Sequence, residues 1–435
     1  MPNSVRILVI GINYAPETTG IAPYTTGLCE HLASQGHQIE VITAFPYYPE
    51  WRVQDGYRGH VYQRQHVNGV TVRRVWHFVP SRASSLVQRL AHDISFSLSA
   101  FLAGLFADPF DVIYCACPPP TAALSAYLLS KIRRKSYVIK LADLASDAAL
   151  STGILTSGLV LRMAMAIEGF VYRGAERVIC LCQGFVEKLK VRGIPAEKLQ
   201  VIPDWADTER IRPVSTAKAF REANDLSTKQ FLLLHTGNMG KKQNLMNVVR
   251  AAEMSQEEPA LLWLLVGHGE ERAKIQEEIA RRKLANIRLL PLQPADRVAE
   301  MYSSADALIL NQQASVRDAV VPSKLLAYMA AGRAVLAAVA ETSEAAQQVR
   351  RAKCGLLVPP DTPEALVAAA LSLQREPSLR QDLGANGRAY VVSKCTKRSV
   401  LQGYDTLFAR WSGERETSFE LAKKATSEPD ASKLP

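Results

Sequence analysis

Two short segments combine residue types that suit the binding of a diphosphate. Gly-Asn-Met-Gly-Lys-Lys-Gln at residues 237–243 follows an apolar run typical of a buried strand. Pro-Ser-Lys-Leu-Leu at residues 322–326 opens a helix, with Pro near its first turn, where the missing N–H costs nothing. Each segment offers backbone N–H groups and a helix end beside a full lysine charge. The residues predicted to hold a nucleotide diphosphate are Gly237, Asn238, Lys242, Ser323, Lys324 and Leu325.

Two glycine-containing turns follow other predicted strands. Gly267 and Gly269 end the strand at residues 261–266 and suit a base or ribose lying across the strand tips. The loop at residues 11–24 joins the first strand to the first helix, and Gly20 could let a ligand approach its backbone closely. Open α/β sheets bind ligands at the carboxyl ends of their strands. Because the loop at residues 11–24 lacks the G-x-G-x-x-G pattern, we expect no dinucleotide cofactor.

Strand-like and helix-like segments alternate along the whole chain, which predicts parallel sheets covered by helices. The predicted strands are 6–12, 40–43, 70–75, 111–117, 136–141, 177–182, 199–202, 231–236, 261–266, 287–290, 307–311, 334–338 and 355–358. The predicted helices are 22–35, 86–106, 121–133, 158–173, 184–192, 244–254, 270–282, 297–305, 323–331, 363–373 and 399–411.

The length of 435 residues fits two domains of about 200 residues each. We predict a first α/β domain at residues 1–207, a polar linker at 208–226 and a second α/β domain at 227–398. The helix at 399–411 is expected to pack back toward the first domain, and the charged tail at 412–435 to be disordered.

Composition narrows the class of protein. The chain is 48% hydrophobic with a net charge of +10, which favours anionic partners, but its basic residues are too dispersed to predict nucleic-acid binding. The longest uncharged helical stretch, residues 94–107, is shorter than the roughly 20 residues that a bilayer needs. Seven cysteines and no convincing signal peptide predict a reducing, cytoplasmic location. The two C-x-C pairs, at 115–117 and 180–182, are interpreted as apolar strand residues rather than a four-sulfur metal site.

An ordered set of motifs resembles the retaining nucleotide-sugar glycosyltransferases of family 4. These motifs are Tyr-Ala-Pro-Glu-Thr-Thr-Gly at 14–20, Gly-His-Gln-Ile at 36–39, Val-Ile-Pro-Asp-Trp-Ala-Asp at 201–207, Met-Tyr-Ser-Ser-Ala-Asp at 301–306 and Cys-Gly-Leu-Leu-Val-Pro at 354–359. The segments at 46–52 (Pro-Tyr-Tyr-Pro-Glu-Trp-Arg), 314–318 and 322–326 are similar to those of the colanic-acid type of exopolysaccharide fucosyltransferases. The resemblance implies the GT-B fold, in which two Rossmann-like domains face a central cleft.

The resemblance also implies roles for particular residues. The second domain would hold a GDP- or UDP-sugar without a metal or other cofactor, and the first would hold a polyprenyl-diphosphate-linked glycan. Further donor contacts are expected from Arg317, Asp318 and Glu344. Asp143 and Asp147 are the candidates for positioning the acceptor hydroxyl. The predicted acceptor-side residues are Glu17, Gly20, Tyr24, Tyr47 and Trp51.

The chain departs from the family pattern at positions that bear on catalysis. The paired glutamates would fall near Ala319 and Ala327, and the arginine of the family's G-R motif is Asn238. These losses leave open a non-catalytic subunit that binds nucleotide sugar or acceptor, and a nucleotide-sugar epimerase is a further alternative. The apolar spacing in residues 86–106 fits either a core helix or peripheral contact with the inner face of the cytoplasmic membrane.

Overall fold

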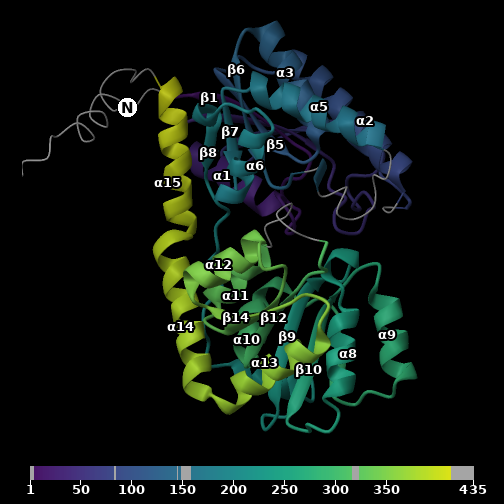
Figure 1. Cartoon of the computed structure of the whole chain (residues 1–435). Helices are drawn as coiled ribbons and strands as arrows, with labels where there is room; N and C mark the ends of the chain where they lie inside the picture. The colour runs from purple at the N-terminus through teal and green to yellow at the C-terminus, as the bar shows by residue number, and fades with distance from the viewer. Residues whose placement is uncertain (1–3, 83–84, 145, 148–157, 316–322, 413–435) are drawn as a thin grey trace, which may run out of the picture.

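The computed structural model describes residues 4–82, 85–144, 146–147, 158–315 and 323–412, which form two α/β halves (Figure 1). The predictions for Arg317, Asp318 and nearly all of the tail therefore lie outside the described residues. Each half is built on its own sheet, and the order of the strands shows how the chain winds.

The first sheet has the strand order β3-β4-β2-β1-β5-β6-β7-β8. Its pairs are parallel except β3 with β4, which is antiparallel. The strands are β1 (Arg6–Gly11), β2 (Gln38–Ala44), β3 (Tyr62–Val67), β4 (Val70–Val75), β5 (Val112–Cys117), β6 (Ser136–Leu141), β7 (Arg177–Cys180) and β8 (Leu199–Val201). The helices of this half are α1 (Ala22–Ser34), α2 (Leu86–Leu105), α3 (Pro120–Arg133), α5 (Gly158–Gly174) and α6 (Gln183–Val191).

The second sheet has the strand order β11-β10-β9-β12-β13-β14, with parallel pairs. The strands are β9 (Phe231–Asn238), β10 (Leu261–His268), β11 (Ile287–Leu290), β12 (Ala307–Asn311), β13 (Ala334–Ala338) and β14 (Gly355–Val358). The helices are α7 (Ala217–Ala223), α8 (Met246–Met254), α9 (Arg272–Arg281), α10 (Val298–Ser304), α11 (Ser323–Ala330), α12 (Glu344–Ala352), α13 (Pro363–Arg375) and α14 (Pro377–Lys394).

Both faces of each sheet are covered, so the strands are apolar on both sides. In β1, Leu8 and Ile10 join one core cluster, whereas Ile7 and Val9 join the cluster on the opposite face. This alternation follows from the two-residue period of a strand. The predicted α/β class with two doubly wound parallel sheets is confirmed.

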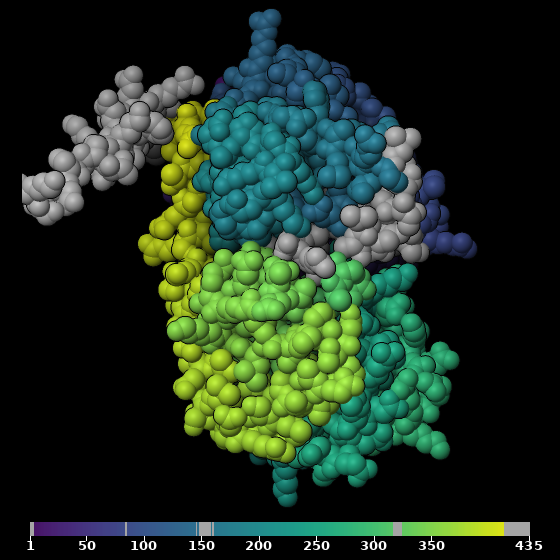
Figure 2. All heavy atoms as spheres, in the orientation of Figure 1, coloured from purple at the N-terminus to yellow at the C-terminus, as the bar shows by residue number. Residues whose placement is uncertain are grey.

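The last helices, α14 and α15 (Lys397–Phe408), run along one side of both halves (Figures 1 and 2). On α15, Tyr404 and Phe408 are buried in the core of the first half, and Asp405 pairs with His31 of α1 at 2.8 Å. A chain that leaves the first half thus returns to it. The exact domain and linker boundaries stay predictions.

Four elements were not predicted from the sequence: β3, α7, α12 and α14. β3 is an exposed edge strand rich in polar residues, so it lacks an apolar signal. Asn68 and Gly69 both have positive φ in the turn that joins it to β4, which is the hairpin geometry that Asn-Gly favours. Within the described residues, no helix is long and apolar enough to cross a membrane.

Candidate functional site

The carboxyl ends of β9 and β10 approach each other so closely that only glycine fits. Gly237 and Gly267 lie opposite each other, with φ of 101° and 148°. A Cβ on Gly267 would lie 1.9 Å from the Gly237 carbonyl oxygen, and one on Gly269 would lie 2.6 Å from Asn238 Oδ1. Close packing therefore requires glycine at 267 and 269, whereas at Gly237 the positive φ favours it. Their contact with a nucleotide stays a prediction.

Hydrogen bonds from residues at and after the end of β12 hold the turn that carries Lys242 in place. Asn311 Nδ2 donates to the carbonyls of Gln243 at 2.7 Å and Asn244 at 3.1 Å. The backbone N–H of Gln313 donates to the Lys242 carbonyl at 3.0 Å. Because these bonds fix the backbone on its buried side, the half-buried lysine is presented at the edge of the sheet.

Lys324 lies directly beside the Gly237 turn, so the two predicted phosphate segments meet. Its Nζ donates to the Thr236 carbonyl at 2.9 Å and would be 3.6 Å from a Cβ on Gly237. Burial lowers the pKa of Lys324 to about 8. Leu325 is fully buried in the core, so only its backbone is free to meet a ligand. Ser323 is the first residue of α11.

A buried histidine supports this lysine. His235 Nδ1 lies 3.2 Å from the Ile309 carbonyl and must donate to it, because a carbonyl only accepts. The lone pair of Nε2 therefore faces Lys324 Nζ at 3.5 Å. Burial, and next the Lys324 ammonium, hold the pKa of His235 well below its usual value. A neutral His235 can thus lie beneath the ammonium without repelling it.

The first half contributes a buried ion pair near the ends of its strands. Lys140, at the end of β6, pairs with Asp204, and both are largely buried. Burial is the largest single effect and lowers the pKa of Lys140, but Asp204 and Tyr404 together outweigh burial and raise that pKa. The Lys140 ammonium also lies 5.1 Å from the centre of the Tyr24 ring, which packs edge-on against Trp205. The contacts with the Lys140 ammonium and the Trp205 ring thereby fix the orientation of Tyr24.

Asp143 connects the two halves electrostatically. Burial raises its pKa to about 6; the Lys242 ammonium lowers that pKa and the Asp204 carboxylate raises it. The charge of a lysine that follows β9 thus acts on a carboxylate that follows β6, and the catalytic role of Asp143 stays a prediction. A carboxyl with a raised pKa where two domains meet is typical of a functional group.

Asp147 has a different environment. Its carboxylate pairs with Lys188 at 3.2 Å and with Arg192, both on or next to α6. These two cations hold the side chain against the first half. The contacts fit a residue that fixes its loop, and a role in catalysis stays a prediction.

Glu17 ties together the two loops predicted to face the acceptor. Its Oε1 accepts from the backbone N–H groups of Tyr47 and Tyr48, each at 2.8 Å, and its Oε2 accepts from Asn13 at 2.8 Å. Burial raises its pKa, although these bonds oppose the rise. Gly20, with φ of 65°, lies against the Tyr48 ring.

Tyr47 is a core residue of this loop. It is 4% exposed, and its hydroxyl donates to His92 Nε2 at 3.0 Å, since His92 Nδ1 is used by the Phe78 carbonyl. Trp51 packs against Tyr47 and lies under the Arg89 guanidinium, 5.4 Å from the ring centre. Of the two, Trp51 keeps the exposed surface that stacking on a sugar would need.

Glu344, the first residue of α12, faces the first half. Its carboxylate pairs with Arg351, and Oε2 would lie 3.4 Å from a Cβ on Gly184, the second residue of α6. A carboxylate beside a helix N-terminus is electrostatically favourable. The structure therefore gives Glu344 a contact between the halves, and its donor contact stays a prediction.

Sequence reasoning did not select Lys140, Asp204 or His235 as site residues. Lys140 and His235 are polar residues within otherwise apolar strands, and each lies near a carboxyl end. That combination is the signal that could have found them, because a buried charge needs a partner.

The comparisons with known proteins agree with this arrangement. Residues 19–205 match the glycosyl transferase 4-like domain, and residues 216–390 match the glycosyl transferases group 1 domain. The chain therefore belongs to this family of glycosyltransferases and is an enzyme of that class. It is 33% identical over 408 residues to the Escherichia coli (strain K12) protein that carries the name colanic acid biosynthesis glycosyl transferase WcaI, covering 92% of this chain and 98% of that protein. The predicted resemblance is confirmed.

Solved structures share the fold at low sequence identity. Sucrose-phosphate synthase from Thermosynechococcus elongatus aligns with a TM-score of 0.75 at 18% identity, over 93% of this chain and 98% of that one. Anabaena Alr3699/HepE in complex with UDP aligns with a TM-score of 0.70 at 15% identity, over 93% and 99%. These likenesses confirm the GT-B fold.

Proposed function

We propose that the protein is a retaining glycosyltransferase of bacterial surface polysaccharide biosynthesis. It would move a sugar from a UDP- or GDP-sugar to a polyprenyl-diphosphate-linked glycan. The observation that carries the proposal is the meeting of Lys324 and the Gly237 turn at the end of β9, with Lys242 on the next turn. Support for the pathway comes from the relative named for colanic acid biosynthesis.

The donor diphosphate would lie between Lys242 and Lys324. Both ammonium groups would offset its charge, and that stabilisation would grow as the sugar leaves and the charge on the leaving diphosphate increases. This use of lysines in place of a metal is part of the proposal. The departing phosphate could accept the proton of the acceptor hydroxyl on the same face, which is how retention arises without a protein nucleophile.

Asp143 is proposed to orient the acceptor hydroxyl. It follows the carboxyl end of β6, and the Lys242 ammonium lowers its pKa. With a pKa of about 6 it is largely ionised at neutral pH and can accept a hydrogen bond. Tyr24 and Trp51 would present ring surface to the acceptor.

The exposed face of α2 is proposed to contact the membrane that holds the acceptor. Its inward residues are mainly small or polar, such as Ser97, Ala100 and Gly104. Large apolar residues instead point to solvent: Val87, Leu90, Ile94, Leu98 and Leu102. An amphipathic helix of this kind can lie in a lipid interface. This contact would place the enzyme at the inner face of the cytoplasmic membrane.

The test is a donor screen with purified full-length protein. UDP and GDP binding is measured first by calorimetry, and the sugar nucleotides of the preferred base are then incubated with a polyprenyl-diphosphate glycan. We expect nucleotide release that depends on acceptor, and a product with the anomeric configuration of the donor. Inversion would contradict the retaining mechanism. Nucleotide binding without turnover would instead favour the non-catalytic subunit that the missing glutamates suggest.

A further inference from the structure

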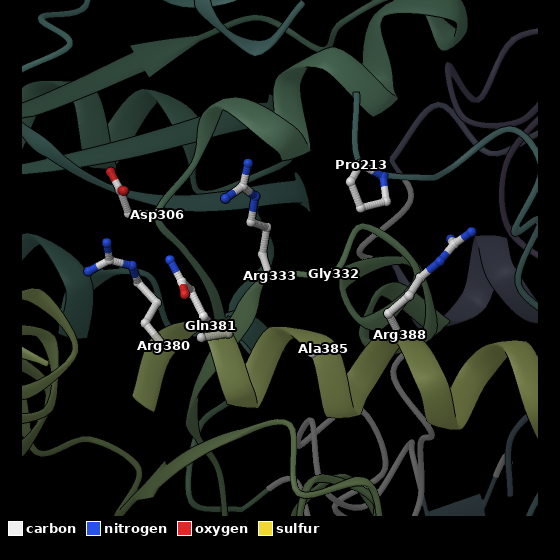
Figure 3. Close-up of a pocket in the computed structure, with 9 residues that line it drawn as sticks. Pro213, Asp306, Gly332, Arg333, Arg380, Gln381, Ala385 and Arg388 are labelled. Carbon is white, nitrogen blue, oxygen red and sulfur yellow. The ribbon is translucent and has the colours of Figure 1, made fainter. Parts of the chain in front are cut away.

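A pocket of about 290 Å³ lies in the second half, away from the donor lysines (Figure 3). It is bounded by Pro213, by the turn Gly332–Arg333 that follows α11, and by α14. Lys324 is at the first turn of α11, whereas this pocket is beyond the last turn. Since α11 has eight residues, the helix separates the two places by about 12 Å.

The lining of the pocket carries excess positive charge. Arg333, Arg380 and Arg388 contribute three cations and Asp306 contributes one anion, which leaves a net charge of +2. Asp306 is already engaged, because it accepts from Arg221 at 2.7 Å and from the Leu232 N–H at 2.8 Å. The Asp306 carboxylate is thus paired with Arg221, which does not line the pocket.

The three arginines differ in how many of their N–H donors are hydrogen-bonded to the protein. Arg388 is committed to backbone carbonyls, donating to Ile211 at 2.8 Å, Ala330 at 2.6 Å and Thr208 at 3.1 Å. In Figure 3 its guanidinium points away from those of Arg333 and Arg380. Arg388 thus serves the fold, and ligand binding would fall to the other two arginines.

Arg333 and Arg380 keep N–H donors that no acceptor in the described part of the chain takes. Arg333 Nη2 donates to the Ser303 carbonyl, but its buried Nε has no partner among the described residues. Arg380 Nη1 donates to the Leu373 carbonyl at 2.8 Å, its guanidinium lies over the Phe231 ring at 5.1 Å from the ring centre, and its other N–H groups have no acceptor among the described residues. Burial lowers the pKa of Arg333, and the Arg221 and Arg380 guanidiniums lower it further although Asp306 opposes them. A buried unpaired donor among repelling cations is costly, and an anion would relieve both costs.

We propose that this pocket binds a phosphoryl group, with Arg333 and Arg380 as its main ligands and the Gln381 side chain at its rim. A phosphoryl dianion matches the two positive charges of Arg333 and Arg380, and guanidinium groups present paired N–H donors that suit its oxygens. The group belongs either to free phosphate or to a small sugar phosphate. Through Arg388 the site adjoins both the end of α11 and the segment around residues 208–211, which leads from the first half to the second.

The experiment titrates inorganic phosphate and, separately, glucose 6-phosphate into the full-length protein by calorimetry. Arg380→Gln should weaken binding about tenfold, as expected for one charge-assisted contact. Gln381→Glu adds a carboxylate at an exposed position and should weaken binding by a similar factor without disturbing the core. Arg250→Gln, at an exposed arginine of α8, is the matched control and should leave the affinity unchanged.

The variant Lys324→Ala distinguishes phosphate binding in this pocket from phosphate binding at the proposed donor site. The proposal requires saturable binding that persists in Lys324→Ala and weakens in Gln381→Glu. Tighter binding of glucose 6-phosphate than of phosphate would identify a sugar phosphate as the ligand, and equal affinities would identify free phosphate. Binding lost in Lys324→Ala but kept in Gln381→Glu would place the anion at the donor site and overturn the proposal, as would the absence of saturable binding at millimolar concentration.

Discussion

Replacement of Lys324 by Met should weaken donor binding and stabilise the fold at the same time. The ammonium is placed for the diphosphate by the Thr236 carbonyl at 2.9 Å and by neutral His235. A lost charge-assisted contact costs about 1.5–3 kcal/mol, which corresponds to roughly a 10- to 100-fold weaker affinity for UDP or GDP. Met matches the unbranched lysine side chain out to Cε, so most of the packing around α11 is preserved.

The gain in stability follows from the pKa of Lys324. Burial lowers that pKa from 10.5 to about 8, so at neutral pH the folded protein pays to keep the ammonium charged. The shift corresponds to roughly 3 kcal/mol, and the lost bond to Thr236 offsets about 1 kcal/mol, which leaves a net gain of about 2 kcal/mol. Between pH 8 and 10.5 the unfolded chain binds more protons than the folded one, so the wild type gains stability as pH rises and the difference closes.

Calorimetric titration with UDP and GDP and urea unfolding at neutral and alkaline pH would measure both effects. Lys218→Met, at a lysine of α7 whose side chain is 74% exposed, makes the same change of charge in the same half and should alter neither. Unchanged nucleotide affinity in Lys324→Met would refute the placement of the donor site. Weaker affinity with loss of stability would instead show that Lys324 acts through the fold.

Three other results are expected. Asp143→Asn should lower kcat about 10- to 100-fold with unchanged donor affinity, because the amide no longer accepts hydrogen bonds through two oxygens. Steady-state kinetics with varied donor and varied acceptor would separate the two effects. An equal loss of donor binding would contradict the acceptor role. The value of kcat/KM should fall as pH rises through about 8, since free Lys324 then loses its charge, and a flat profile from about pH 7 to 9 would exclude this lysine as a donor ligand. The double variant Leu98→Glu with Leu102→Glu should sediment less with anionic vesicles while keeping soluble nucleotide binding, and unchanged sedimentation would remove α2 from the membrane contact.

Much of the fold is visible in the sequence because the central strands are buried on both faces. A continuous apolar run such as residues 261–266, followed by a helical pattern, predicts a strand buried on both faces of a parallel sheet. The prediction missed α14 for a definite reason. Its glycines lower helix propensity, and their value appears only in three dimensions, where a Cβ on Gly384 would lie 2.4 Å from the Gly332 carbonyl oxygen.

The sequence predicted the site residues whose position depends on the end of a single strand. It did not predict the contacts that form between segments far apart in the sequence. Gly237 and Lys324 could be assigned to one ligand because both lie at carboxyl ends of parallel strands or at the helix beside them. The ion pairs of Asp147 depend on a helix 40 or so residues later, and the contact of Glu344 with Gly184 depends on how the two halves meet. No local sequence pattern predicts contacts between remote segments. The sequence therefore indicated which residues matter but not which residues they contact.

The proposed roles of Lys242 at the donor and Asp143 at the acceptor predict a particular pH dependence. In the free protein, Lys242 lowers the pKa of Asp143 against the effect of burial. A bound diphosphate neutralises Lys242 and adds negative charge nearby, so both changes raise the pKa of Asp143 above about 6. Because kcat reports the complex and kcat/KM the free enzyme, the acid limb of kcat should lie at higher pH than that of kcat/KM. Coincident limbs would mean that Lys242 and Asp143 do not face the same donor.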